Sequence, residues 1–403
     1  MTDYDVIVVG GGPAGSTAAR RIAQRNLSVV IFDKDAFPRN KACAGGIRNF
    51  VAENLDFSIE SVVERKVYGQ RLYGPSGVLV DCRRSYASGH MVMRTEFDHL
   101  LLQKAGEAGA DVRDGVKIVD VEQNQEKVTV KTEDGQKISS KYLIGADGIN
   151  STVAKSLGFY KGWSNDSAAI AIQVEAEVGK ETVERICGVP SDKEGVAIDI
   201  FFGPVPHGYA WCFPKKSILS VGAGCRQDRA KNIRGDFNKW FDDFKQKHDI
   251  SPTILSDTAA RLPYSGAVKK TVMGRTILIG DTAGFVNPFS GEGIPMAITS
   301  GIIAAPVIEK ALKGANPRVL SEYEKGWKEA FGDDLKIGKG LAKMTYKSNK
   351  NMETIMQIAH KDYHVNDIMY KMISGEDTYK NLKKALTKRI MLKHPRAGIS
   401  LYI

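Results

Sequence analysis

The sequence predicts an α/β domain of the Rossmann type, a second domain built on an antiparallel sheet, and a C-terminal helical region. Three patterns support this prediction: a glycine-rich turn between an apolar run and a helical pattern near the N-terminus, strand patterns in the middle of the chain, and a basic helical pattern after residue 321. With 403 residues, 42% of them hydrophobic, the chain can form two or three cores, which excludes disordered and fibrous proteins.

The first domain begins with a β-α-β pattern. Residues 4–9 and 28–32 are short apolar runs, and residues 13–25 between them have a helical period. No basic segment precedes the first run, and glycines end it after a few residues, so it predicts a buried strand and not a signal peptide. This pattern is typical of the start of a doubly wound sheet.

Later segments return to the first domain. Residues 97–108 have an amphipathic helical pattern, and alternating strand patterns lead from residue 112 to residue 144. A strand signal returns at residues 276–279, before a long apolar helix pattern over residues 294–311. We therefore predict a discontinuous first domain made of residues 1–60, 90–162 and 271–325.

The second domain is predicted from its strand patterns, which cover residues 168–178, 196–202, 209–213 and 218–223. A mostly antiparallel sheet is the simplest account of them. We predict a second domain made of residues 61–89 and 163–270, and a C-terminal helical region of residues 326–403.

The cysteine and histidine patterns indicate which disulfides, metal sites and cellular compartment to expect. The five cysteines are odd in number, scattered and without a Cys-x-x-Cys pair, so we expect no disulfide framework, no zinc or cluster site and a cytoplasmic location. His360 and His364 lie four apart, but the Glu of a His-Glu-x-x-His motif is absent, so we predict no metal.

A membrane span needs about 20 apolar residues. The candidate run 302–312 is shorter and is interrupted by Pro306, Glu309 and Lys310.

The charge is concentrated near the C-terminus. The net charge is +10, and from Lys339 onward there are 13 basic and 5 acidic residues. Residues 380–396 interleave these charges with Leu382, Leu386, Ile390 and Met391. This pattern predicts either peripheral contact with an anionic membrane or a solvated basic helix docked on the protein. We expect no nucleic-acid partner.

A dinucleotide motif follows the first predicted strand. Residues 10–15 read Gly-x-Gly-x-x-Gly, between a strand and a helix, and Asp33 ends the next strand about 20 residues later. The helix N-terminus favours an anion, and glycines let a pyrophosphate approach the backbone. A tight glycine turn with an unrelated Asp33 is the alternative. The predicted cofactor contacts here are Gly10, Gly12, Pro13, Ala14, Gly15, Asp33 and Lys34.

Two later segments, residues 143–148 and 277–284, each place a strand before a Gly/Asp turn. With the first motif they make the chain resemble the flavoprotein monooxygenase-like superfamily of the para-hydroxybenzoate hydroxylase type. The resemblance implies FAD, with Gly280 and Asp281 at the ribityl chain and Asp147 and Gly148 near the pyrophosphate and, in many members, NADPH. It also implies that Arg94 lies near the cofactor. A solvated arginine at a helix start is the alternative.

Three further segments resemble geranylgeranyl reductases. Residues 208–215 contain Tyr-x-Trp-x-Phe-Pro, and residues 41–47 are similar to a Lys-Pro-Cys-Gly-Gly stretch, although Ala42 and Ala44 depart from it. Residues 288–294, which contain Ser-Gly-Glu-Gly-Ile, are similar to the chlorophyll and bacteriochlorophyll branch. Because Gly291 and Gly293 precede a helix beginning near Ile294, free N–H groups there can face reduced flavin.

The proposed substrate contacts have simpler alternatives. Tyr209, Trp211 and Phe213 alternate along a strand and share one face, which suits a wall beside an apolar chain, or equally a domain core. We expect Lys215 to be solvated, or to contact an anionic head group. Cys43 is either a proton donor, a small wall of the active site, or a buried small hydrophobe.

The sequence therefore predicts an FAD-dependent reductase that saturates double bonds of a geranylgeranyl or longer polyprenyl chain, with NADPH or another reductant as donor. Cys43, Tyr209, Trp211 and Phe213 are the predicted catalytic residues. Two alternatives stay open. One is an FAD-dependent monooxygenase or halogenase-like enzyme, and the other is a nucleic-acid or membrane adaptor built on a degenerate flavin fold.

Overall fold

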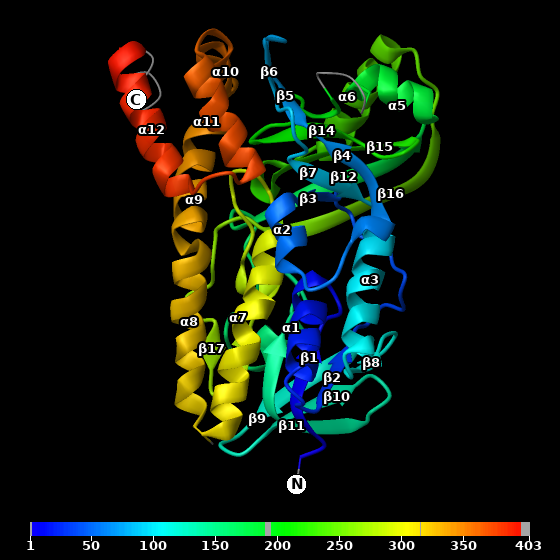
Figure 1. Cartoon of the computed structure of the whole chain (residues 1–403), viewed down its shortest axis with the longest axis vertical. Coiled ribbons are helices and arrows are strands. Elements are labelled where there is room, and N and C mark those ends of the chain that lie inside the picture. Colours follow the sequence, from blue (N-terminus) through cyan, green and yellow to red (C-terminus); the bar gives the residue numbers. More distant parts are fainter. Residues whose placement is uncertain (1, 190–194, 315, 396–403) are drawn as a thin grey trace. The chain divides into compact units, whose positions relative to one another are not determined.

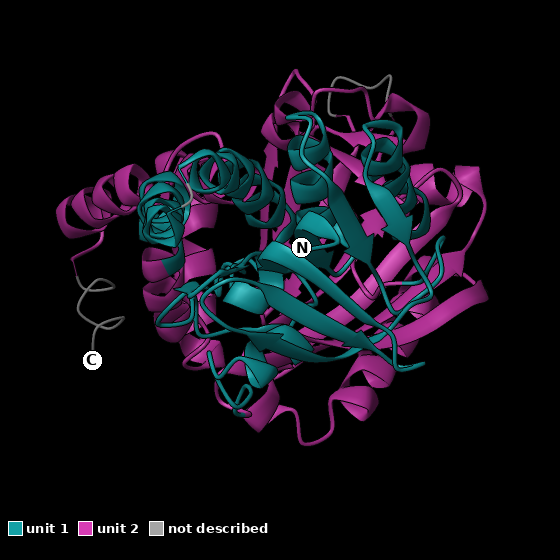
Figure 2. Ribbon diagram, turned by 90° about the horizontal axis from the view of Figure 1, so that it is seen from below, with its two compact units in different colours: residues 1–40, 94–164, 262–335 teal, residues 41–93, 165–261, 336–403 magenta. Residues whose placement is uncertain are grey.

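A computed structural model describes residues 2–189, 195–314 and 316–395 (Figure 1). The chain forms two compact units (Figure 2). Unit 1 comprises residues 1–40, 94–164 and 262–335, and unit 2 comprises residues 41–93, 165–261 and 336–403.

The units are divided at different residues from the predicted domains. Residues 41–60 lie in unit 2, because β3 (Gly46–Arg48) pairs with β7 (Gly89–Val92), which also pairs with β4 (Val63–Val67). The C-terminal helices form no third unit. Residues 326–335 belong to unit 1 and the helices after them to unit 2, where α10 (Asn349–Lys361) contacts β6 (Leu79–Arg83).

Unit 1 is built around a mostly parallel sheet. Its central strand β1 (Tyr4–Val9) pairs in parallel with β2 (Val29–Phe32) and with β11 (Lys137–Gly145), and β11 pairs in parallel with β18 (Thr276–Leu278). These strands are apolar and largely buried, as expected where helices cover a parallel sheet. The predicted β-α-β unit and α/β class are confirmed.

The other elements of unit 1 complete the sheet and its cover. The remaining strands are β8 (Asp111–Arg113), β9 (Ile118–Gln123), β10 (Val128–Thr132) and β17 (Val272–Met273). The α-helices are α1 (Pro13–Ala23), α3 (Arg94–Glu107), α4 (Thr152–Ser156), α7 (Ile294–Lys313) and α8 (Ser321–Trp327). Short helical turns are η3 (Gly280–Ala283), η4 (Pro317–Leu320) and the π-helical η5 (Lys328–Gly332).

Helix α7 corrects one expectation. It runs without a break through Pro306, so the apolar run is not interrupted there. Among the described residues it is the one helix long and apolar enough to cross a membrane by length and composition, yet more than half of it is buried in the protein. It packs closely on α1, since a Cβ on Gly301 would lie 2.7 Å from the carbonyl oxygen of Ala14.

Unit 2 contains a seven-stranded, mostly antiparallel sheet, so the predicted second sheet is confirmed. One face packs on α5 (Lys180–Cys187) and α6 (Ile233–His248) through a core that includes Val174, Val221 and Phe237. The strand order is β16 (Thr253–Pro263), β12 (Ala168–Glu177), β15 (Ile218–Arg226), β14 (Gly208–Pro214), β13 (Ala197–Phe202), β5 (Gly69–Tyr73), β6.

The predicted C-terminal helices are present. They are α9 (Asp333–Thr345), which contains the unit boundary, α10, α11 (Tyr363–Ser374) and α12 (Tyr379–Lys393). Glu353 of α10 accepts hydrogen bonds from the backbone and hydroxyl of Ser76, and Arg84 forms an ion pair with Asp367 of α11. Short helices α2 (Asn49–Asn54), η1 (Glu60–Val62) and η2 (Gln227–Arg229) complete unit 2.

Candidate functional site

The glycine turn after β1 admits no side chain at two positions. Gly10 has a φ of +109°, and a Cβ on it would lie 2.2 Å from the carbonyl oxygen of Ala146. A Cβ on Gly15 would lie 1.8 Å from the carbonyl oxygen of Gly10. The two glycines thus let α1 begin directly against the ends of β1 and β11. Gly12 caps α1 and Pro13 is its first residue, so the first turn presents N–H groups without helical partners.

Asp33, at the end of β2, holds this turn in place. Its Oδ2 accepts the backbone N–H of Gly11 over 2.6 Å, and its Oδ1 accepts that of Asp35 over 2.9 Å. Each carboxylate oxygen has a further lone pair, so the same side chain can accept hydrogen bonds from a ribose. Lys34 is exposed.

Two arginines share one buried carboxylate beside the turn. Arg94 makes a bidentate ion pair with Asp98, with both N–O distances at 2.7 Å, and an Nη2 of Arg39 lies 3.2 Å from the same carboxylate. Arg94 is only 8% exposed, so the solvated alternative for it was wrong. The Arg39 guanidinium lies 3.5 Å from where a Cβ on Gly12 would stand. The Arg39 guanidinium therefore lies beside the first turn of α1.

Sequence reasoning missed Arg39 and Asp98. Arg39 follows no motif with a characteristic spacing, and Asp98 reads as an ordinary polar position of an amphipathic helix. The only available signal was a basic residue a few positions after Asp33, and such residues are too common to identify a cofactor contact.

The second predicted turn contacts the third. The Asp147 carboxylate accepts the Ser151 hydroxyl over 2.6 Å and the Thr152 N–H over 2.7 Å, so it caps α4. Burial raises the pKa of this carboxyl. Gly148, with φ +78°, donates its N–H to Oγ1 of Thr282 over 2.8 Å. No described atom lies within 4 Å of a Cβ on Gly148, which leaves its outer side open.

The third turn meets the first. A Cβ on Gly280 would lie 2.9 Å from Cβ of Ala14, so η3 packs on the start of α1. Asp281 follows, half-buried, and among the described residues its carboxylate makes no hydrogen bond or ion pair. Its Oδ1 lies 3.3 Å from where a Cβ on Gly293 would stand.

The segment before α7 completes this part of unit 1. Gly293 caps α7, Ile294 is its first, buried residue, and Gly291 has a φ of +71° and donates its N–H to the Asn287 carbonyl. The structure thus brings together the predicted residues of the three turns and of this segment, which are far apart in the sequence.

These residues fit an FAD molecule. The free N–H groups of α1 and the Arg39 guanidinium suit a pyrophosphate, and Asp33 suits a ribose. Asp281 offers an unengaged carboxylate for the hydroxyls of a ribityl chain. Of the described atoms, a Cβ on Gly12 would meet only the Arg39 side chain within 4 Å and a Cβ on Gly148 would meet none, so the backbone is open to a large cofactor at these two positions.

A second group of predicted residues lies in unit 2. Tyr209, Trp211 and Phe213 share one face of β14, as predicted, on the side opposite α5 and α6. The Trp211 indole lies over β15, because a Cβ on Gly222 would be 2.3 Å from its Cζ2. Tyr346, directly after α9, stacks on Tyr209, with ring centroids 6.4 Å apart. Among the described residues, buried Nε1 of Trp211 has no hydrogen-bond partner.

The loop that carries Cys43 joins the same unit. Gly45 has a φ of +77°, and a Cβ on it would lie 2.0 Å from the carbonyl oxygen of Val92, so the loop is held against β7. A Cβ on Gly46 would lie 3.4 Å from the Phe213 ring. Cys43 is a half-buried free thiol, three residues from this contact. Two of the three segments that resemble geranylgeranyl reductases, residues 41–47 and 208–215, therefore adjoin.

Lys215 is the clearest correction. It was expected to be solvated or at a head group, but it is fully buried, and its Nζ lies 2.7 Å from Oε1 of Glu175. The same Oε1 accepts from Gln173 Nε2 over 2.7 Å and from the Ser220 hydroxyl over 3.1 Å. Lys215 follows β14, and Glu175 lies on β12, which β15 separates from β14 in the sheet. The lysine is buried because this partner neutralises its charge.

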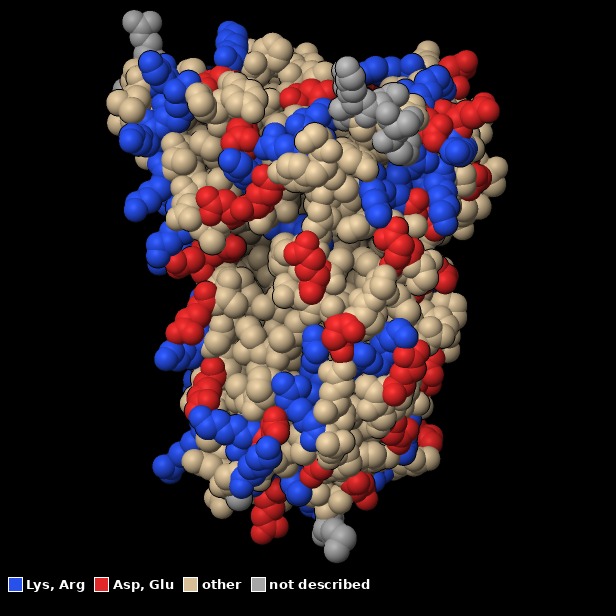
Figure 3. Space-filling view, in the orientation of Figure 1, with Lys and Arg blue, Asp and Glu red and all other residues tan. Residues whose placement is uncertain are grey.

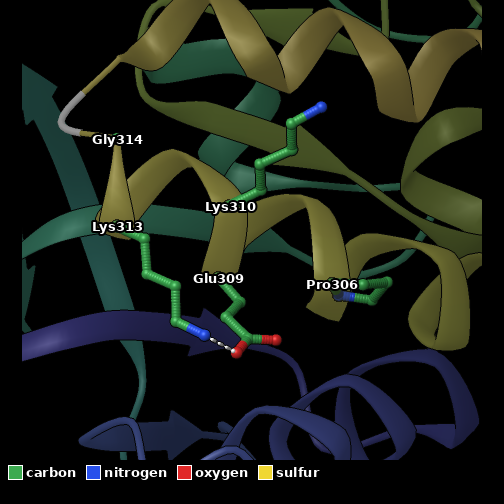
Figure 4. A pocket seen from close by; sticks show the side chains of 5 residues that line it. All are labelled: Pro306, Glu309, Lys310, Lys313 and Gly314. Atoms are coloured by element: carbon green, nitrogen blue, oxygen red, sulfur yellow. Dashed lines mark hydrogen bonds and ion pairs between the residues drawn. The ribbon is translucent and has the colours of Figure 1, made fainter.

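Two other features of the described residues, a surface pocket and potential metal ligands, were compared with this site. A surface pocket is lined by residues near the end of α7, among them Glu309 and Lys313, which form an ion pair (Figure 4). It lies about 20 Å or more along α7 from Gly293, at about 1.5 Å per residue. Within the described residues, no group of three or more His, Cys, Asp or Glu could hold a metal ion.

Comparison with known proteins identifies the family. The FAD binding domain family matches residues 3–330. An uncharacterised protein of Methanosarcina barkeri is 32% identical over 313 residues, which cover 78% of this chain and 76% of that protein. The digeranylgeranylglycerophospholipid reductase of Methanocaldococcus jannaschii is 29% identical over 405 residues, covering 96% and 95%.

Solved structures agree. A geranylgeranyl bacteriochlorophyll reductase-like protein of Thermoplasma acidophilum superposes with a TM-score of 0.81 at 25% identity, over 99% of this chain and 98% of that chain. The halogenase PltM, at 15% identity and a TM-score of 0.72 over 99% and 95% of the two chains, shares the fold alone. The chain therefore belongs to the FAD binding domain family, as an FAD-dependent oxidoreductase of the geranylgeranyl reductase type.

Proposed function

We propose that the protein reduces carbon–carbon double bonds in a geranylgeranyl or longer polyprenyl chain. The observation that carries the proposal is the aromatic face of β14 beside the Cys43 loop, in a chain that also holds an FAD-binding cradle. One relative is named a digeranylgeranylglycerophospholipid reductase, and a similar solved structure is described as geranylgeranyl bacteriochlorophyll reductase-like, so the two names share the geranylgeranyl chain. The substrate class is therefore defined by its tail.

An isolated double bond has no adjacent carbonyl to accept charge. Its reduction adds a hydride to one carbon and a proton to the other, while the π bond breaks and two C–H bonds form. Reduced FAD supplies the hydride in such a reaction. The protein has to bind the cofactor, orient the chain and exclude water.

We assign the cofactor contacts to unit 1. Gly10, Gly12, Gly15 and Arg39 would bind the pyrophosphate, Asp33 a ribose, and Asp281 the ribityl hydroxyls. The N–H groups at Gly293 and Ile294 would stabilise negative charge on the reduced ring system. Three other predicted contacts have indirect roles. Asp147 accepts hydrogen bonds from the first turn of α4, and Gly148 leaves space on its outer side. Arg94 orients the Asp98 carboxylate, which in turn holds Arg39.

We assign the substrate contacts to unit 2. Tyr209, Trp211 and Phe213 offer a rigid apolar wall for an isoprenoid chain, and Cys43 provides a small thiol at its edge. An apolar environment keeps water from the reacting carbons. We propose NADPH or another reductant as the electron donor, and the cytoplasm as the location.

Mass spectrometry of the product tests the proposal. Chemically reduced enzyme is incubated with a geranylgeranyl lipid, and the expected product gains two hydrogens per double bond. Incorporation of oxygen from labelled dioxygen, or of a halogen, would instead support the monooxygenase or halogenase alternative. An unchanged lipid in the presence of bound, reduced FAD would reject the polyprenyl substrate. The adaptor alternative conflicts with the relatives that are named reductases and match most of this chain.

A further inference from the structure

We infer that the outward face of α12 is a docking surface for an anionic lipid membrane. This face consists of Lys380, Lys384, Lys388, Met391 and Leu392, and all five side chains are exposed. In Figure 3, Lys and Arg side chains gather along α12 at the upper left. The inference goes beyond the proposed reaction and does not depend on it.

The inner side of α12 is attached to unit 2. Tyr379 and Leu382 are buried. Near the end of the helix, the Asp362 carboxylate accepts from Nε and Nη2 of Arg389 over 2.7 and 3.0 Å, and lies 2.9 Å from Nε2 of His394. Because these contacts fix the rotation of the helix about its axis, the opposite face is held toward solvent.

The outward residues form one row. Lys380, Lys384, Lys388 and Leu392 follow each other at four-residue steps, so their side chains stand above one another on a helix. Met391 is adjacent, three residues after Lys388. Met391 is 59% exposed and Leu392 is 68% exposed. On this face three cations are thus followed by an exposed apolar pair, Met391 and Leu392.

Two lysines of the row, Lys384 and Lys388, differ from lysines on other helices of the part of the chain that the structure describes. On α7, Lys313 pairs with Glu309 over 2.6 Å, and on α11, Lys371 pairs with Asp367 over 2.8 Å. Helix α12 has six basic residues and no acidic one. Among the described residues, Lys384 and Lys388 have no ion pair. Like charges four residues apart destabilise a helix, and an anionic surface removes this repulsion.

The exposed aliphatic side chains favour a membrane over a nucleic acid. Lysines attract the phosphates of either partner. A bilayer also offers a headgroup and acyl boundary into which Met391 and Leu392 can insert, whereas a duplex offers phosphates and base edges to a basic helix. A helix that presents a row of lysines together with the apolar pair Met391 and Leu392 therefore suits an anionic bilayer.

The test is co-sedimentation of the full-length, FAD-loaded protein with vesicles. We expect binding to vesicles that contain phosphatidylglycerol, little binding to pure phosphatidylcholine, and loss of the charge-dependent part at about 1 M salt, where the screening length is about 3 Å. K384E/K388E should weaken binding by about 25-fold or more, on the order of fivefold for each lysine lost. M391S/L392S should weaken it at every salt concentration.

A matched control lies in unit 1. Lys131 and Lys137 are exposed and directly opposite each other on β10 and β11, so K131E/K137E makes the same charge change away from α12. Membrane binding by this variant should equal that of the unchanged protein. FAD content and melting temperature show whether K384E/K388E folds. If it does not, K384Q/K388Q replaces it, and its vesicle binding should likewise be weaker than that of K131E/K137E.

Three results would overturn the inference. The first is equal binding to neutral and anionic vesicles. The second is an equal loss of vesicle binding in K384E/K388E and K131E/K137E. The third is binding to a DNA duplex that is as tight as binding to vesicles and is lost in K384E/K388E. Reductase activity on detergent-dispersed lipid reports separately on the proposed function.

Discussion

Gly148 donates its backbone N–H to the hydroxyl of Thr282 across 134 residues of sequence, over 2.8 Å. Thr282 is fully buried, and the same oxygen lies 3.4 Å from Oδ1 of Asp147. One hydroxyl thus joins the turn after β11 to the turn after β18. Both turns contribute to the proposed cofactor cradle, so the position of Asp281 depends on this contact.

Replacing Thr282 by valine tests this link. The shape of the side chain is kept, but the half-buried Gly148 N–H loses its acceptor, so the free energy of unfolding should fall by about 0.5–1.5 kcal/mol. FAD affinity, measured by quenching of flavin fluorescence, should fall with it. Thr282→Ser keeps the hydroxyl and should retain most of both. Equal losses in the two variants would contradict a role for the hydrogen bond.

Replacing Arg39 by glutamine should weaken FAD binding. The loss of a charge-assisted hydrogen bond to an anion corresponds to about 1.5–3 kcal/mol, or roughly 10- to 150-fold in Kd. Isothermal titration of the apoprotein with FAD measures this directly. Asp98→Asn should weaken binding less, since it releases the guanidinium without removing it. An unchanged Kd for Arg39→Gln would show that the arginine only stabilises the fold.

Replacing Gly222 by alanine should displace the Trp211 indole. The added Cβ would lie 2.3 Å from Cζ2 of Trp211 and 2.4 Å from the Ile172 carbonyl oxygen. Overpacking of this kind costs about 1–3 kcal/mol. Gly224→Ala is the matched control, because its Cβ meets only ordinary contacts at 3.5 Å or more. Near-ultraviolet circular dichroism and KM for a polyprenyl substrate should change in the first variant alone.

Replacing Lys215 by methionine leaves the Glu175 carboxylate buried without its cation. Breaking one side of a buried ion pair costs about 3–5 kcal/mol in unfolding free energy. In K215M/E175Q the uncompensated charge is gone, so this double variant should be more stable than Lys215→Met alone. Urea unfolding of the two single variants and the double variant gives the coupling energy. A coupling near zero would show that the charges do not interact.

Acid should loosen α12. Hydrogen bonds from Arg389 first, and then from His394, lower the pKa of Asp362 below its ordinary value, while burial opposes them. A carboxyl with a lower pKa in the folded state stabilises the fold above the unfolded value of about 3.9 and loses that contribution as pH falls. The protection factors of the α12 amides, which are the intrinsic exchange rate divided by the observed rate at each pH, should therefore fall below about pH 4. In Asp362→Asn these protection factors should be lower at pH 7 and show little of this acid dependence.

Local patterns in the sequence were enough to predict part of the molecule. The β-α-β start, the glycine turn and the shared face of Tyr209, Trp211 and Phe213 each depend on neighbours within a few residues, through helical or strand period and the need for a positive φ at Gly10. These features could be predicted because backbone geometry is set by short-range sterics. Helix α6 was missed, since it lies within the predicted second domain, where only strand patterns were identified.

Only the tertiary structure decided how charges are paired and which segments share a unit. The sequence alone does not reveal that Asp98 holds both Arg39 and Arg94, that Glu175 buries Lys215, or that β3 pairs with β7 and so moves residues 41–60 into unit 2. The physical reason is that a buried charge needs a partner within about 4 Å, and the strand pairing that supplies this partner joins residues far apart in the chain.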